Sequence, residues 1–422
     1  MRRGDCGRRV GLALGALALL ALTAAPRGVA VAGEDPPPVA AQPEPAERPM
    51  RPLPAYKHPY PDGLYSTIVA MITVGAPEIE KLKKIKLKIP GFKSDLQVRA
   101  ILQEKPAPLI VVLVGVDGKA DTPLGRLFPF WLNDAGFNVL AFDSTFRPAF
   151  AETSRLGVTG NFSVECEYLA KIVAEFLKLD AVKKVVTRVG VVGYSLGGTQ
   201  ALVLANLAAE GKLPFELSGA LAFSPLIKLK STAGILDDFY AKDRYKYTMI
   251  DMGKTFLTHE PVAAGAKIPF EPAFMRAGIG FVIREEFTEI VDRNDKLFKL
   301  KQLPEEEKLQ PGENRRSIAE VDWGFSRFME KMCYPYWKEK SAFTSVDDLW
   351  KSGDLTRCMK KTPPYARAIL CENDPFNSPE DLAELKKSVE AKNLIVVEHG
   401  GHLGYIGTVW CYAHLMRMFA FK

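Results

Sequence analysis

One serine stands in a setting that could support nucleophilic chemistry. Residues 193–197 read Gly-Tyr-Ser-Leu-Gly, which fits the pattern G-x-S-x-G. Residues 188–192 before this turn, which are apolar after Arg188, predict a strand, and residues 196–209 after it predict a helix. A serine on so tight a turn holds its hydroxyl above the sheet edge, where the N-terminal end of the helix favours developing negative charge. The pattern predicts a nucleophile at Ser195; the alternative is a serine that only caps the helix.

A serine hydroxyl is a weak nucleophile at neutral pH and needs a neighbouring base. The chain has five His, and those that follow Ser195 are His259, His399, His402 and His414. His402 comes after the last predicted strand, and the two Gly before it make a flexible turn that can project an imidazole. His402 is therefore the predicted base, with His399 as the alternative.

His399 and His402 could also be interpreted as metal ligands. The sequence offers no convincing third ligand nearby and lacks the helix that the H-E-x-x-H motif requires. We therefore expect no metal and no organic cofactor, and a mechanism that uses protein groups alone.

An imidazole base needs a carboxylate that fixes its tautomer and stabilises its protonated form. The tetrapeptide Glu-Asn-Asp-Pro follows directly after the predicted strand 365–371. Asp374, held by the following proline, is the predicted acid, and Glu372 is the second choice. An ordinary turn aspartate before proline is the alternative. The chain order Ser195, Asp374, His402 is typical of proteins with a nucleophile on a strand-to-helix turn.

Acyl transfer places negative charge on a carbonyl oxygen, which fixed backbone N–H groups can stabilise. The amide of Leu196, directly after the nucleophile, is the first predicted donor. The second donor should come from the loop 115–118, which follows the apolar strand 109–114. Val116 is the predicted residue, and the alternative is a plain turn that ends a buried strand.

The predicted elements explain how these loops come together. Apolar runs and period-2 patterns predict strands at 64–74, 85–89, 96–102, 109–114, 137–142, 185–192, 217–223, 365–371 and 394–397. Amphipathic segments predict helices at 124–135, 161–179, 196–209, 379–390 and 405–419. The alternation predicts an α/β fold with a mostly parallel central sheet flanked by helices. This sheet domain comprises 64–225 and 363–422, and the irregular stretch 226–362 is expected to be a mainly helical insertion.

The N-terminal region has the features of an export signal. Four Arg near the start precede an apolar run at 10–25, and the small-x-small pattern Ala-Val-Ala ends at Ala32. We expect a signal peptide at residues 1–32, cleaved after Ala32, and a secreted or periplasmic protein. An uncleaved membrane anchor is the alternative. Residues 33–63 contain ten Pro and predict an extended tether.

Composition excludes other classes of protein. The chain has 422 residues, 47% of them hydrophobic, which is enough for a large core. Its formal charge is +6, but residues 1–32 hold five Arg and one Asp, so the remainder is nearly neutral and we expect no nucleic-acid partner.

The alternation of apolar and basic residues at 85–89 indicates an edge strand with solvated lysines; contact with a membrane surface is the alternative. Export permits disulfides, and a bridge between Cys333 and Cys358 is one pairing that the sequence allows.

Taken together, these loops resemble the α/β-hydrolase superfamily. Gly-Gly-His-Leu-Gly-Tyr at 400–405 is similar to the G-G-H-x-G-[FY] loop of one esterase branch, and Asn-Asp-Pro-Phe at 373–376 is similar to the family's acid loop. That branch has H-G-L-E-G at its oxyanion loop, whereas residues 114–118 read Val-Gly-Val-Asp-Gly. The usual His is Val114, a departure that leaves the backbone donors in place. The resemblance implies an α/β-hydrolase fold with a lid at the position of the insertion.

The insertion is rich in aromatic residues. It holds Trp323, Trp337 and Trp350 together with several Phe and Tyr. Such side chains could line an apolar acyl pocket that excludes water. Alternatively, they form the insertion's own core.

These inferences predict an exported serine hydrolase that cleaves an ester or other acyl substrate, of small-molecule or lipid-like type, through an acyl-enzyme. Ser195 would attack, His402 would move the proton, and Asp374 would orient His402. Two alternatives keep the same fold: an acyltransferase that passes the acyl group to an alcohol, and a non-catalytic envelope binding protein. The chain lacks the G-x-x-x-x-G-K-[ST] phosphate loop, so nucleotide hydrolysis is not expected.

Overall fold

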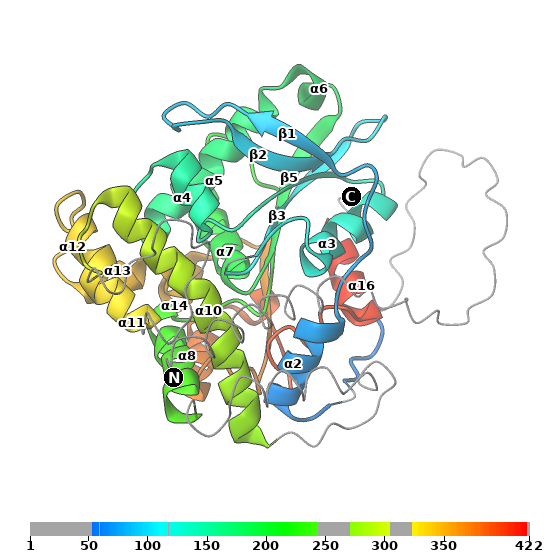
Figure 1. Ribbon diagram of the computed structural model, residues 1–422. Coiled ribbons are helices and arrows are strands. Elements are labelled where there is room, and N and C mark those ends of the chain that lie inside the picture. Colours follow the sequence, from blue (N-terminus) through cyan, green and yellow to red (C-terminus); the bar gives the residue numbers. More distant parts are fainter. Residues whose placement is uncertain (1–52, 59, 117, 244–270, 304–322, 420–422) are drawn as a thin grey trace, which may run out of the picture.

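A computed structural model describes residues 53–58, 60–116, 118–243, 271–303 and 323–419 (Figure 1). At its centre lies an eight-stranded sheet with the order β1-β2-β4-β3-β5-β6-β7-β8. The strands are β1 (Lys83–Leu87), β2 (Leu96–Ile101), β3 (Ala107–Leu113), β4 (Asn138–Phe142), β5 (Val186–Tyr194), β6 (Gly219–Phe223), β7 (Ala366–Cys371) and β8 (Leu394–Val397). β2 is antiparallel to both of its neighbours, and the pairs from β4 to β8 are parallel. The predicted α/β fold with a mostly parallel sheet is confirmed.

Helices cover both faces of this sheet, because the central strands are apolar on both sides. Along β3, Leu109 and Val111 pack with one core cluster, and the alternating Ile110 and Val112 pack with the other. The first cluster includes side chains of α5 (Phe162–Leu177) and α7 (Leu196–Ala209), and the second includes side chains of α3 (Pro123–Asp134) and α16 (Val409–Phe419). Figure 1 shows α3 and α16 on the face opposite α5 and α7. The shorter helices around the sheet are α4 (Pro148–Ser154), α6 (Asp180–Lys183) and α15 (Pro379–Ser388).

The strand at the sheet's edge has the predicted two-sided character. Lys83, Lys84 and Lys86 of β1 are exposed, whereas Leu87 is buried. Because β1 pairs with β2 and lies at the end of the strand order, its lysines face solvent along an open edge. The solvated edge strand is thus confirmed.

The predicted strand at 64–74 is wrong, because this segment forms the helix α2 (Gly63–Thr73). Apolar runs of this length do not distinguish a buried strand from a buried helix. The deciding residue is Asp62, whose side chain accepts a hydrogen bond from Tyr65 N at 2.7 Å and so caps the helix. The sheet therefore lacks a strand there, and α2 packs beside the sheet's carboxyl edge instead.

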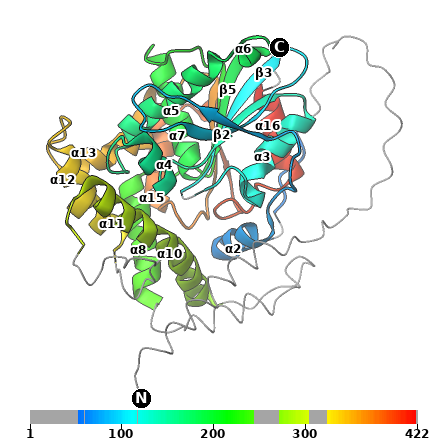
Figure 2. The same ribbon diagram turned by 45° about the horizontal axis from the view of Figure 1, so that its top comes forward.

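The chain between β6 and β7 is helical in its described part. It contains α8 (Leu229–Asp243), α10 (Pro272–Phe298), α11 (Phe325–Phe328), α12 (Tyr334–Trp337), α13 (Val346–Trp350) and α14 (Leu355–Cys358). Figure 2 shows α8, α10 and α11 gathered on one side of the sheet. Trp323, Trp337 and Trp350 are buried in the same cluster as the sheet's own side chains. The structure therefore favours the interpretation of these rings as core.

Several other predictions concern the cysteines and the N-terminal region. Cys333 and Cys358 are free thiols, so the bridge that the sequence allowed is not formed. The predicted signal peptide and the tether up to residue 52 lie outside the described residues. The end of the tether range does pack on the core, since Tyr56 contacts Trp410 with 4.8 Å between ring centroids.

Among the described helices, none combines the length and apolar character needed to cross a membrane.

A buried carboxyl group on α5 ties this helix to α7. Glu165 accepts hydrogen bonds from Gly160 N and Thr145 Oγ1, each at 2.7 Å, and from Gln200 Nε2 at 3.4 Å. Burial raises the pKa of Glu165 to about 7 even though these donors favour the charged form. In the unfolded chain the same group titrates near its ordinary value of 4.5. Its contribution to stability is therefore complete below about pH 4.5 and is lost as the pH rises through about 7.

We expect the Glu165→Gln variant to gain stability relative to the unmodified chain as the pH rises from 4.5 to 8. The gain should reach about 3 kcal/mol, because the ionised form that burial disfavours is absent from the variant. Urea unfolding at intervals across this range measures the difference. A difference that stays constant with pH would contradict the buried, neutral state of Glu165.

Candidate active site

Ser195 occupies a sharp corner between β5 and α7. Its backbone has φ +55° and ψ −127°, a conformation that L-residues rarely adopt. Two glycines permit the corner: a Cβ on Gly193 would lie 2.1 Å from the carbonyl oxygen of Gly197, and one on Gly197 would lie 2.3 Å from that of Leu113. Ser195 N–H donates to the carbonyl of Phe223 at 2.9 Å, which holds the corner against β6. The sequence pattern thus folds into the turn that it predicted.

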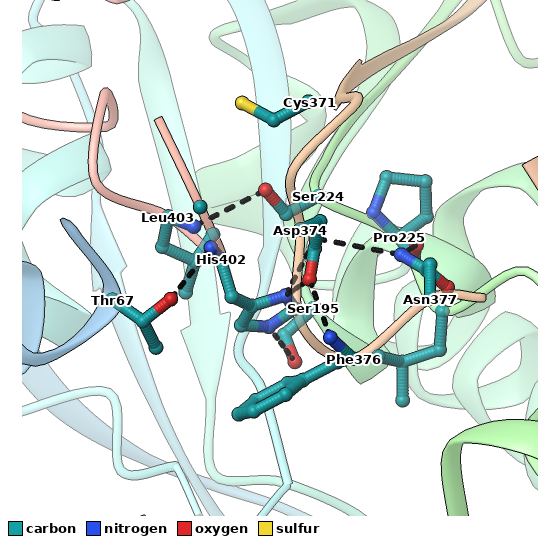
Figure 3. A network of polar contacts seen from close by, with 12 residues as sticks. Thr67, Ser195, Ser224, Pro225, Cys371, Asp374, Phe376, Asn377, His402 and Leu403 are labelled. Carbon is teal, nitrogen blue, oxygen red and sulfur yellow. Dashed lines mark hydrogen bonds and ion pairs between the residues drawn. The ribbon is translucent and has the colours of Figure 1, made fainter. Parts of the chain in front are cut away.

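The structure brings together the three side chains that the sequence singled out (Figure 3). His402 Nε2 lies 2.9 Å from Ser195 Oγ, and His402 Nδ1 lies 2.9 Å from Asp374 Oδ2. All three residues are buried, with 8% or less of each exposed. Low exposure strengthens such charge-assisted contacts because water does not compete for them. The series can pass a proton from the serine hydroxyl to the imidazole while the carboxylate stabilises the charged ring.

Asp374 is oriented by its own loop as well as by the imidazole. Phe376 N–H donates to Asp374 Oδ1 at 2.9 Å, and Asn377 Nδ2 donates to Asp374 Oδ2 at 3.4 Å. Glu372, the second choice, instead forms an exposed ion pair with Lys386 at 2.8 Å. The carboxylate beside the imidazole is therefore that of Asp374.

The other described histidines lie away from the contacts between Ser195, His402 and Asp374. His399 pairs with Glu398 on the surface at 3.3 Å. His414 packs on Trp410 within α16, with 4.2 Å between ring centroids, and burial lowers its pKa to about 4. His259 lies outside the described residues. Within the described ranges, no group of three or more His, Cys, Asp or Glu is arranged to hold a metal ion.

The loop that carries His402 is held by residues that sequence reasoning missed. Leu403 N–H donates to Ser224 Oγ at 3.2 Å, and the Tyr405 hydroxyl contacts both Ser224 N and the carbonyl of Ile369 at 2.9 Å. On the other side, His402 N–H donates to Thr67 Oγ1 at 2.8 Å. Tyr405 belongs to the loop motif and could have been singled out, whereas Thr67 carries no sequence signal because its segment was predicted as a strand.

An aromatic ring covers the imidazole. The Phe376 ring lies 4.3 Å from the His402 ring, measured between centroids. Phe376 also packs near Phe239 of α8, at 6.4 Å between ring centroids. The Phe376 ring therefore packs against both the imidazole and the first helix of the insertion.

The loop after β3 passes directly beside the nucleophile. A Cβ on Gly115 would lie 3.3 Å from Ser195 Cβ and 3.6 Å from Ser195 Oγ. The Tyr194 hydroxyl bonds to the backbone of Gly115, and Gly118 N–H donates to the Gly115 carbonyl at 3.0 Å, which fixes the loop. Val116 follows Gly115 and is half-buried, while Val114, at the position of the departure from the resemblance, is buried in the core.

Leu196, the first predicted donor, lies at the start of a helix. Leu196 is the first residue of α7, so its N–H has no acceptor within that helix. The predicted pair of Leu196 and Val116 therefore flanks Ser195 from α7 and from the β3 loop. Asp117, the next residue of that loop, lies outside the described residues.

Comparison with known proteins assigns the family. Residues 111–407, more than half of the chain, match the model of the alpha/beta hydrolase family. The chain belongs to this family and is a hydrolase, which confirms the resemblance. The matched range begins within β3, so α2, β1 and β2 precede it. No curated protein matches the chain.

Several solved structures are similar in fold. An esterase of Pyrococcus furiosus shares 14% identity with a TM-score of 0.44, covering 82% of this chain and 97% of that one. An alpha/beta hydrolase from a Penicillium species shares 16% identity with a TM-score of 0.43, covering 80% and 99%. A 2,6-dihydroxy-pseudo-oxynicotine hydrolase shares 13% identity with a TM-score of 0.41, covering 80% and 67%.

Proposed function

We propose that this hydrolase is a serine enzyme that cleaves an ester or other acyl substrate through a covalent acyl-enzyme. The observation that carries the proposal is the buried, continuous series of contacts from Ser195 Oγ through His402 to Asp374. These hydrogen bonds support the proposal, because an imidazole that contacts a serine hydroxyl and a carboxylate that contacts the imidazole suit acyl transfer.

In the first half of the reaction, Ser195 Oγ attacks the carbonyl carbon of the substrate. His402 Nε2 accepts the hydroxyl proton as the new C–O bond forms, and the negative charge moves to the carbonyl oxygen. The imidazolium then gives this proton to the leaving alkoxide, and the bond between the carbonyl carbon and the leaving group breaks. The products are a free alcohol and Ser195 acylated on Oγ.

In the second half, water replaces the alcohol. His402 Nε2 takes a proton from the attacking water, the tetrahedral intermediate forms again, and the proton returns to Ser195 Oγ as the acyl bond breaks. A carboxylic acid is released and the enzyme is regenerated. Asp374 keeps Nδ1 protonated throughout, so that Nε2 is free to act as the base.

The backbone around Ser195 provides the electrostatic part of this mechanism. We assign the oxyanion to the N–H groups of Leu196 and Val116. The proximity of Gly115 to Ser195 supports this assignment, because the carbonyl oxygen of a substrate whose carbonyl carbon is bonded to Ser195 Oγ would lie against this backbone. The N-terminal end of α7 adds partial positive charge at the same place.

The helical insertion is proposed as the cover of the site. Its beginning is bonded to the acid loop: Ile227 N–H donates to Asn377 Oδ1 at 2.8 Å, and Thr232 Oγ1 donates to the Phe376 carbonyl at 2.9 Å. A cover attached at this point would shield His402 from water and present apolar side chains to the acyl part of the substrate.

Replacing Ser195 by Ala should abolish covalent labelling by a fluorophosphonate and lower the hydrolysis of p-nitrophenyl acetate by about a thousandfold or more, because the attacking oxygen is lost. Peptide mass spectrometry locates the adduct in the unmodified chain. The matched control is Ser218→Ala, which removes a hydroxyl bonded to the Val189 carbonyl at the opposite edge of the sheet. This control should label at the normal rate. A folded, unmodified chain that fails to label at Ser195 would instead support a non-catalytic binding protein.

Export is the second part of the proposal, supported by the charged start, the apolar run and the Ala-Val-Ala pattern of residues 1–32. Expression of the full chain in a secreting host should give a mature protein that begins at Gly33, as measured by intact mass. Ala32→Arg should block the processing, because signal peptidases require a small residue there. An exported chain that retains residues 1–32 would contradict cleavage.

A further inference from the structure

The His402 loop has an unusual backbone. Between β8 and α16 it consists of turns, and Gly400, Gly401 and Leu403 have φ of +133°, +56° and +68°. Leu403 is strained in this region, since a side chain disfavours positive φ. A loop of this kind keeps one conformation only where its surroundings hold it.

The N-terminal segment, residues 53–58 and 60–67, makes some of the contacts that hold the His402 loop in this conformation. Thr67 Oγ1 accepts the hydrogen bond of His402 N–H at 2.8 Å and donates its own proton to the Gly63 carbonyl at 2.7 Å. Both residues are buried, so water does not replace either bond. The backbone of the proposed base is thus bonded directly to α2.

Two more hydrogen bonds connect the same two parts of the chain directly, and two others connect them through Asn373. Asn373, next to Asp374, donates from Nδ2 to the Pro61 carbonyl at 2.8 Å and accepts from Gly401 N–H at 2.9 Å. His58 Nε2 lies 3.1 Å from the Gly404 carbonyl oxygen, and the Tyr56 hydroxyl donates to the His399 carbonyl. The N-terminal segment therefore contacts the His loop before and after His402, and it reaches the acid loop through Asn373.

Packing between these parts leaves no room for additional atoms. A Cβ on Gly401 would lie 2.1 Å from the Gly63 carbonyl oxygen, and one on Gly404 would lie 2.9 Å from Ser66 Cβ. Glycine is needed at Gly401 because the backbone of the His loop lies directly on α2; at Gly404 a Cβ would also lie 2.3 Å from the carbonyl oxygen of Gly400 within the loop. The two surfaces are fitted to one another, although the N-terminal segment precedes the range that matches the family.

We infer that residues 53–58 and 60–67, here called the N-terminal clamp, set the position of the His402 imidazole, with Thr67 as a positioning residue. The inference rests on the proposed function in so far as His402 is the base. Without the Thr67 hydroxyl, His402 N–H is left buried without an acceptor, and the loop relaxes toward conformations in which Nε2 no longer faces Ser195.

The test compares Thr67→Val with Thr73→Val. Valine keeps the shape of threonine but removes its hydroxyl. Thr73 is a matched control on the same helix, because its Oγ1 donates to the Val69 carbonyl at 2.8 Å, as Thr67 does to Gly63, and its side chain is exposed to solvent. Thr67→Ser, which keeps the hydroxyl, tests for rescue.

With p-nitrophenyl acetate, Thr67→Val should lower kcat about tenfold and leave KM within about twofold, and the rate of fluorophosphonate labelling should fall in parallel. Thr67→Ser should restore most of the rate, and Thr73→Val should behave as the unmodified chain. Hydrogen exchange of the peptide around His402 should be faster in Thr67→Val only. A normal kcat and labelling rate in folded Thr67→Val would overturn the inference.

A second variant serves if Thr67→Val does not fold. Tyr56→Phe keeps the ring that packs on Trp410 and removes only the hydroxyl bonded to the His399 carbonyl. It should accelerate exchange in the His loop and slow labelling about two- to threefold; unchanged exchange and labelling would count against the clamp.

Failure of the proposed function is a separate result. An unmodified chain that does not label at Ser195 removes the catalytic role, while hydrogen exchange in these variants still decides whether the clamp holds the loop.

Discussion

The contact between Ser195 Oγ and His402 Nε2, at 2.9 Å, is the interaction on which the rest of the site depends. The two residues are 207 positions apart in the chain. Because both side chains are short, they can make contact only where the fold brings their backbones close together. They meet because β5, β7 and β8 run parallel and end at the same edge of the sheet. The mostly parallel sheet is thus the physical requirement for the proposed chemistry, because it brings Ser195, Asp374 and His402 to one place.

Several residues with strained backbone conformations lie where the ends of these strands bring the side chains together. Ser195, Ser224 and Leu403 all have positive φ, and all three lie at or next to the reacting side chains. Each is secured by a bond from another element: Ser195 N–H to β6, Ser224 N–H to the carbonyl of Ile369 in β7, and Leu403 N–H to Ser224 Oγ. Strain of this kind persists only where neighbouring structure holds it, and these three hydrogen bonds contribute to that hold.

Much of this architecture could be predicted from the sequence because the signals are local. The strand–turn–helix around Ser195 has a distinctive glycine pattern, the apolar run of β3 is typical of a buried parallel strand, and Asn161, at the start of the predicted helix 161–179, caps α5. Asp374 could be predicted for the same reason, because it lies just after the strand that became β7. These features depend on residues within a few positions of one another.

The remaining features depend on contacts between distant segments. The segment 64–74 has apolar residues that suit a strand or a helix, and its cap at Asp62 together with its packing on the His loop decides for the helix. Thr67 could not be singled out for the same reason, since its partner His402 is 335 residues away. The aromatic residues of the insertion were ambiguous between pocket and core, and only three-dimensional packing shows Trp323, Trp337 and Trp350 to be buried.

The central claim is that Ser195 is the attacking oxygen and that the backbone beside it receives the negative charge. The most direct measurement is a crystal structure of the chain after reaction with a phosphonate ester, whose phosphorus centre imitates the tetrahedral intermediate. The account predicts a bond from Ser195 Oγ to phosphorus and a phosphoryl oxygen within about 3 Å of the N–H groups of Leu196 and Val116. An adduct on another residue, or a phosphoryl oxygen directed away from both amides, would contradict it.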